Sequence, residues 1–283
     1  GNTTAINNEL DATKNQTFTY DDLNRIRTFN GAWGSGAFTY DVGGNRLRKT
    51  IAGVATSYHY STTKRLTGTT GGELLSCSYN STGHLSSGSK DGISYSLTYD
   101  GFNQVKSIQI DSITELEAGY DGDGLRVVKD GENGTIVYHY DPAGNVLSEN
   151  DDTGQKIADY VYLNGKLIGK VAVNPSAQEE NYYYHTDQVG TVLAISNAAG
   201  QKVWEADYKP FGEEFSVVAS EENAKLFVGK EKDVETDLNY FGARYLHAEI
   251  GRFLSPDAVR AVDAQSGQLN AALLANPQRH NVY

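Results

Sequence analysis

The chain has 283 residues, a formal net charge of −12, 19 Tyr, 30 Gly, one Cys and no Met. The acidic balance argues against a nucleic-acid-binding surface, and the densest basic cluster (Arg46, Arg48, Lys49) is interpreted as one face of a strand. The single Cys77 excludes an intramolecular disulfide and a cysteine-based metal site, and no apolar run is long enough to predict a membrane span. The composition favours strands broken by tight turns.

A unit of about twenty residues repeats along most of the chain. Each copy has an alternating run that ends in Tyr, a cluster of Asp, Asn, Gly or Ser, and then a second alternating run. The copies read "YDDLNRI" at Tyr20, "YDVGGNRL" at Tyr40, "YSTTKRL" at Tyr60, "YNSTGHL" at Tyr79, "YDGFNQV" at Tyr99, "YDGDGLRV" at Tyr120, "YDPAGNVL" at Tyr140, "YLNGKLI" at Tyr162 and "YHTDQVGTVL" at Tyr184. So regular a spacing predicts a repeat protein.

Each repeat is predicted to form one antiparallel hairpin, because Asp and Asn bond their own backbone in turns and Gly accepts a positive φ. A parallel β-helix with one coil per repeat is the alternative. The repeat tyrosines are expected to line one face of the sheet in a structural role: Tyr20, Tyr40, Tyr99, Tyr120, Tyr140 and Tyr184. A sheet of this many strands cannot stay flat, so the fold class is all-β with a long spiralling sheet.

The pattern changes after Tyr208. The stretch "KPFGEEF" introduces a Pro, and "SEENAKLFVGK" predicts a short helix with Ser220 as its N-cap. We therefore predict a repeat ribbon over residues 1–215 and a closing segment with short helices over residues 216–283, since repeat arrays need atypical terminal units.

Two stretches carry a resemblance to a known family: "YYYHTDQVGTVLAISNAAGQKVWEADYKPFGE" and "YFGARYLHAEIGRFLSPD". Together with the Tyr-Asp repeats, they resemble the YD-repeat, or RHS-repeat, proteins and their associated core domain, as in bacterial polymorphic toxins, toxin-complex C proteins and teneurin shells. The matching signature residues are Tyr240, Gly242, Ala243, Arg244, Tyr245, Gly251, Arg252, Phe253, Ser255, Pro256 and Asp257. The resemblance implies a hollow shell that encloses a variable C-terminal polypeptide. It also implies a secreted or surface protein of a bacterium or archaeon.

The resemblance further implies an aspartate-based self-cleavage, in which Asp257 would act as the base and Arg244 would keep it ionised. The alternative is a buried Arg–Asp pair with a structural role only. The chain departs from the family where Ala258, Val259 and Arg260 follow Asp257, and it stops at "NPQRHNVY", short of the family's Asp-Pro-x-Gly cleavage site. We therefore expect no enzymatic activity from this chain by itself.

Other sites have little support. The histidines lack the spacing of a helical zinc site, and "DGDG" at Asp121 lacks the downstream Glu of a calcium loop, so no metal or cofactor is expected. Two functions stay open. The chain is either a shell fragment whose partner is its own C-terminal cargo polypeptide, or a surface or matrix module that binds glycans or forms homo-oligomers or filaments through exposed sheet edges.

Overall fold

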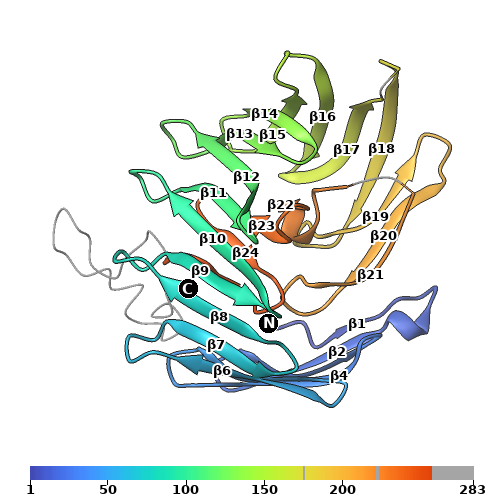
Figure 1. Ribbon diagram of the computed structural model, residues 1–283. Coiled ribbons are helices and arrows are strands. Elements are labelled where there is room, and N and C mark those ends of the chain that lie inside the picture. Colours follow the sequence, from blue (N-terminus) through green and yellow to red (C-terminus); the bar gives the residue numbers. More distant parts are fainter. Residues whose placement is uncertain (175, 221–222, 257–283) are drawn as a thin grey trace. The chain divides into compact units, whose positions relative to one another are not determined.

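The computed structural model describes residues 1–174, 176–220 and 223–256 (Figure 1). Two compact units are present: residues Gly1–Tyr95 with Ser255 and Pro256, and residues Ser96–Leu254. Consecutive strands pair antiparallel in both, which confirms the predicted all-β hairpin fold and excludes the parallel β-helix. The boundary predicted at residue 215 falls within strand β21, and a separate closing domain stays a prediction.

The first unit contains a short 3₁₀ turn, η1 (Ala12–Lys14), and the following strands: β1 (Ala5–Ile6), β2 (Gln16–Tyr20), β3 (Ile26–Gly31), β4 (Gly34–Tyr40), β5 (Arg46–Ile51), β6 (Val54–Tyr60), β7 (Leu66–Gly71), β8 (Leu75–Tyr79) and β9 (Leu85–Lys90). Strand β10 (Ile93–Tyr99) crosses from the first unit into the second.

The second unit continues the hairpin series with β11 (Val105–Ile110), β12 (Ile113–Tyr120), β13 (Arg126–Gly131), β14 (Gly134–Tyr140), β15 (Val146–Asn150), β16 (Lys156–Leu163), β17 (Lys166–Val173), β18 (Glu179–Thr186), β19 (Val192–Asn197), β20 (Lys202–Tyr208) and β21 (Glu214–Ala219). A separate four-stranded sheet follows: β22 (Glu231–Asp233), β23 (Leu238–Tyr240), β24 (Tyr245–His247) and β25 (Arg252–Phe253).

Strands are joined by two kinds of turn. In the wider kind, Oδ1 of Asp141 accepts hydrogen bonds from the backbone N–H groups of Ala143 and Asn145, at 2.8 and 2.9 Å, and Gly144 has φ +80°. The same side-chain bonds recur in nine other turns, which start at Asp21, Asp41, Asn80, Asp100, Asp121, Asp151, Asn174, Asp187 and Asn197. This confirms the turn chemistry predicted for the repeat.

Several of the narrower turns have two central residues that both have positive φ, as in Asn164-Gly165 (+52° and +75°) and Ala52-Gly53 (+48° and +83°). This is the type I′ geometry whose twist matches that of the flanking strands.

Several repeat tyrosines each tie a hairpin to the one before it. The hydroxyl of Tyr40, at the end of β4, donates to the carbonyl of Ile26 at the start of β3, at 3.0 Å. Tyr140 donates in the same way to the carbonyl of Arg126 at 2.7 Å. Equivalent bonds run from Tyr60, Tyr120 and Tyr208 to Arg46, Val105 and Val192. Each ring therefore packs on the sheet while its hydroxyl satisfies a strand terminus.

Two repeats depart from this pattern. Strand β16 continues past Tyr162 into a two-residue turn, and Tyr184 lies two residues before Thr186, the last residue of β18. Tyr184 thus occupies the inward position that Tyr138 has in β14. It joins the core of the second unit, which also contains Tyr160, Leu167, Trp204 and Val192.

The helix predicted at residues 220–230 is wrong for the residues described there. The N–H of Ser220 donates to Val203 O at 2.8 Å and so extends the pairing of β21 with β20. The only helical element described in this stretch is a 3₁₀ turn, η2 (Phe227–Gly229), in which Val228 has φ +53°. The chain turns back here because Lys225 forms a β-bridge to Glu231.

Candidate functional site

The candidate functional site is the place where the C-terminal strands meet the repeats in the second unit. Strands β22 and β23 lie beside β12 and β13 (Figure 1), with Tyr240 and Tyr120 ring centroids 6.5 Å apart. Strand β22 alternates, so that Glu231 and Asp233 are buried on one side of it. A cluster of buried charges connects these two acids to the repeats. We call it the anchor network, and it comprises Arg126, Lys129, Glu149, Lys225, Glu231, Asp233 and Glu235.

A β-bulge aims the cations of β13 at this site. Tyr120 pairs with Arg126 and Gly119 pairs with Val128, so one extra residue stands at the start of β13. The bulge shifts the alternation, and the first and fourth residues of the strand, Arg126 and Lys129, are both buried as a result.

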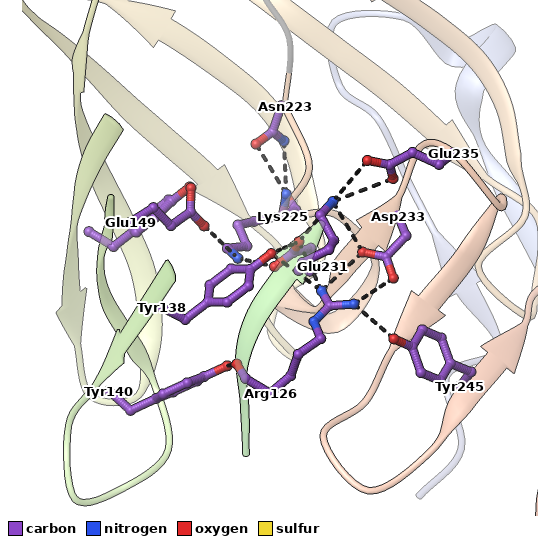
Figure 2. A network of polar contacts seen from close by, with 12 residues as sticks. Arg126, Tyr138, Tyr140, Glu149, Asn223, Lys225, Glu231, Asp233, Glu235 and Tyr245 are labelled. Atoms are coloured by element: carbon purple, nitrogen blue, oxygen red, sulfur yellow. Dashed lines mark hydrogen bonds and ion pairs between the residues drawn. The ribbon is translucent and has the colours of Figure 1, made fainter. Parts of the chain in front are cut away.

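Arg126 is the centre of the anchor network (Figure 2). Its guanidinium donates to both carboxylate oxygens of Asp233, at 2.6 and 3.0 Å, and it lies 3.0 Å from a carboxylate oxygen of Glu231. It also donates to the hydroxyl of Tyr245 at 2.8 Å. The Arg126 and Asp233 side chains are both 0% exposed. A bidentate pair of this kind fixes orientation as well as distance.

Two lysines complete the anchor network. Lys129 Nζ lies 3.4 Å from Asp233 and Glu235 carboxylate oxygens and 3.5 Å from one of Glu231. Lys225 Nζ lies 2.6 Å from Glu231 and 3.1 Å from Glu149 on β15. Three cations thus face four carboxylates, and each of these charges removed from water has a partner of opposite sign.

Tyrosine hydroxyls add further hydrogen bonds to the anchor network. Tyr138 donates to Glu231 Oε1 at 2.6 Å, and Tyr160 donates to Glu149 Oε2 at 3.0 Å. Tyr240 Oη accepts from the backbone N–H of Arg126 at 3.0 Å, and its ring lies under the Arg126 guanidinium, 4.3 Å from ring centroid to Cζ. The arrangement binds the C-terminal segment to three repeat strands, β13 to β15.

Electrostatics keep Glu231 and Lys225 of the anchor network ionised. Burial alone would raise the pKa of Glu231, but Lys225, Arg126 and Lys129 outweigh it and hold that pKa well below its ordinary value. Burial alone would lower the pKa of Lys225, yet Glu231 and Glu149 raise it instead. Because Glu231 stays a carboxylate at neutral pH, it cannot donate a proton there, and its contacts are those of an anchor.

A small cleft opens beside the anchor network. It has a volume of about 120 Å³ and is lined by Tyr140, Tyr162, Lys225, Val228 and Tyr240 among others. Two of its polar side chains already have partners within the protein, because Tyr140 donates to the Arg126 carbonyl and Lys225 donates to Glu231. The described residues contain no group of three or more His, Cys, Asp or Glu side chains placed to hold a metal ion.

Comparison with known protein families shows to which family the chain belongs. The sequence matches the teneurin YD-shell family over residues 1–283. The chain belongs to this YD-shell family. No curated protein matches it.

Solved structures resemble the YD-shell chain only in part. The crystal structure of TcdB2-TccC3-Cdc42 is 15% identical, with a TM-score of 0.34 over 94% of this chain and 21% of that chain. The Photorhabdus luminescens Tc holotoxin pore with a TccC3 variant is also 15% identical, with a TM-score of 0.34 over 93% and 21%. A porin-like protein from Bacteroides uniformis is 12% identical, with a TM-score of 0.30 over 75% and 92%. The chain thus spans about a fifth of the length of the first two.

The residues predicted to cleave the YD-shell chain are only partly described. Arg244 lies before β24, and its guanidinium covers the ring of Phe253 at 3.8 Å. Asp257 lies outside the described residues, so the pairing of Arg244 with Asp257 stays a prediction. Gly251 has φ +62° and donates its N–H to His247 O at 2.8 Å, which turns the chain from β24 into β25. Arg252 and Phe253 form β25, and Pro256 is the last described residue.

The anchor network itself was missed from the sequence. One signal was present: Glu231, Asp233 and Glu235 alternate in "EKDVE", as acids on one face of a strand would. The interpretation of Arg46, Arg48 and Lys49 as one strand face is wrong. The β-bulge after Tyr40 shifts the alternation, so that Arg48 is exposed while Arg46 and Lys49 are buried.

Proposed function

We propose that this chain is a structural part of an exported β-shell, and that it encloses or presents a variable polypeptide at its C-terminal side. Membership of the YD-shell family supports a shell-like structural module. The observation that carries the proposal is the anchor network, because it fixes the C-terminal strands on the repeats through side chains at 0% exposure. A chain segment that leads to a cargo needs such a fixed starting point.

A structural role also fits the chemistry of the site. The carboxylates of the anchor network are paired with cations, and the tyrosines of the site bond within the protein. Self-cleavage at Asp257 is an additional prediction for a longer parent protein, in which a further C-terminal segment would follow this chain. Among the described residues, no helix has the length and apolar character needed to cross a bilayer. Export is proposed from the family relationship alone.

The test uses the parent protein with its natural C-terminal extension. We expect the extension to resist an added protease while attached to the folded shell and to be digested after the shell is unfolded in urea. Intact mass of the parent and of an Asp257→Asn variant tests cleavage in the same experiment: two fragments are expected from the parent and one uncut chain from the variant. An extension digested as fast in the native state as in urea would overturn enclosure.

Self-assembly is a second candidate because strand β21 is apolar and accessible. Phe215, Val217 and Val218 are 44%, 46% and 64% exposed. Exposed apolar strands favour pairing with another chain. Sedimentation at increasing protein concentration should show association that a Val218→Lys variant lacks, and an unchanged sedimentation coefficient in the parent chain would rule this candidate out. Glycan binding stays a prediction from the sequence.

A further inference from the structure

One repeat tyrosine of the second unit differs from its equivalents in what its hydroxyl contacts. Strand carbonyls accept a hydrogen bond from the hydroxyls of Tyr40, Tyr60, Tyr120, Tyr140 and Tyr208. In those repeats the tyrosine ends its strand, whereas β16 continues past Tyr162 to Leu163. The Tyr162 hydroxyl has no hydrogen-bond partner in the part of the chain that the structure describes, although the side chain is half-buried. A half-buried donor without a protein partner indicates a position for a ligand.

Tyr162 lines the cleft of about 120 Å³ beside the anchor network, and the whole lining belongs to the second unit. Three turns of the repeats contribute to this lining through Gly144, Gly165 and Gly190, and η2 contributes another part. A Cβ atom at Gly165 or Gly190 would meet no atom within 4 Å, so both glycines face open space. The volume suits a group of about four to six non-hydrogen atoms, since a cavity of about 150 Å³ accepts benzene.

The charges of the lining favour an anion. Its charged side chains are Lys166, Lys225, Lys230 and Glu231. Lys225 is paired with Glu231 at 2.6 Å, which leaves the charges of the other two lysines. Lys166 donates to the carbonyl of Asp187 at 3.1 Å, and a lysine has about two more donors to give. Lys230 is exposed, and its ammonium group has no hydrogen bond or ion pair with the described residues. Cations thus prevail here in a chain whose net charge is −12.

We propose that this cleft binds a small carboxylate, with the Tyr162 hydroxyl as hydrogen-bond donor and Lys166 and Lys230 as counter-charges. Burial raises the pKa of Tyr162, so the hydroxyl keeps its proton and donates it in a hydrogen bond. A carboxylate fits better than a phosphate, because the second negative charge of a phosphate would face Glu149 and Glu231. A free small acid and an acidic side chain of a polypeptide both present this group, and the test separates them.

Acetate is the first probe, added to the full 283-residue chain in place of chloride at constant ionic strength. Urea midpoints and the NMR shifts of amides that line the cleft are expected to change saturably, because about 100 mM acetate nearly fills a site with a millimolar Kd. Acetamide, the neutral analogue, should leave both unchanged. The absence of saturable binding, or an equal response to acetamide, would overturn the site. Tighter binding of inorganic phosphate than of acetate would overturn the choice of a carboxylate.

Tyr162→Phe removes the proposed donor and keeps the ring. Without acetate its urea midpoint should stay close to that of the parent chain, because the hydroxyl has no protein partner to lose. The Kd for acetate should rise about tenfold, the ratio for one hydrogen bond to a charged group. Tyr40→Phe is the matched control from the first unit, since it loses the bond to the Ile26 carbonyl. Its midpoint should fall while its Kd for acetate stays the same. An unchanged Kd in Tyr162→Phe would contradict the proposal.

A second probe identifies the source of the carboxylate. N-acetyl-glutamate amide presents the same group as the side chain of a blocked peptide unit. Tighter binding than acetate would assign the cleft to an acidic polypeptide side chain, and weaker binding would assign it to a free small acid. Lys230→Gln should weaken both probes about threefold, as expected for an exposed charge, and it replaces Tyr162→Phe if that variant does not fold. Failure of both probes would overturn this site and leave cargo enclosure untouched, because enclosure is tested on the extension of a longer parent.

Discussion

The repeats and the C-terminal strands are stabilised over very different distances along the chain. Most wide turns are closed by an Asp or Asn that bonds residues two and four positions later, as Asp41 does, and repeat tyrosines such as Tyr40 reach back to a neighbouring strand. The C-terminal strands depend on partners more than a hundred residues away, as between Arg126 and Asp233. Loss of a repeat contact should therefore act locally, whereas loss of a network contact should release a whole segment.

The largest effect is expected for Arg126→Met. The change would leave Asp233 and Glu231 buried without their main counter-charge, and breaking a buried ion pair costs about 3–5 kcal/mol in the free energy of unfolding. Urea denaturation measures it. The matched control is Arg48→Met on the exposed side of β5, which should shift the midpoint little. Equal shifts for both variants would contradict a special role for the anchor network.

Acid should weaken the attachment of the C-terminal strands to the repeats. The pKa of Glu231 is lowered in the folded state, so its ionised form adds stability above the ordinary value of 4.5 and that stability is lost as the pH falls toward the folded-state pKa. Urea midpoints between pH 6 and pH 3 should fall less steeply in Glu231→Gln than in the parent chain, although the variant starts lower at neutral pH. Parallel pH profiles would show that Glu231 does not carry this dependence.

The same contrast explains what could be predicted from the sequence. The hairpins were predictable because their determinants are adjacent: Tyr140, Asp141, Gly144 and Asn145 specify one turn by themselves. The anchor network was not, because nothing local to Arg126 indicates that its carboxylate partner is Asp233. The β-bulge hid the signal further, since strict alternation would place Lys129 on the face opposite Arg126. The prediction of a helix after Ser220 was wrong because acidic residues and a capping serine favour a helix only weakly. Tertiary contacts override that preference, and Ser220 pairs with Val203 of β20 instead.

A single repeat tyrosine should matter moderately. Tyr140→Phe removes the hydrogen bond to the Arg126 carbonyl while keeping the ring, and the loss of one such bond costs about 1 kcal/mol. Tyr183→Phe is the control, because Tyr183 is 51% exposed on β18. Hydrogen exchange of β13 amides should report the change locally. A loss of protection that extends evenly over β17 to β20 would argue against local stabilisation of the repeats.

The smallest effect is expected where an ion pair lies on the outer surface of the repeats. Lys156 and Asp159 approach to 2.6 Å, but their side chains are 43% and 37% exposed, so water screens the charges and already solvates both groups. Asp159→Asn should leave the urea midpoint unchanged at physiological salt, in contrast to Arg126→Met. Two ion pairs with the same 2.6 Å separation would then differ in their contribution to stability, because one is buried and the other is exposed. A midpoint shift in Asp159→Asn that rivals the one in Arg126→Met would refute that explanation and place part of the stability of the ribbon on its surface.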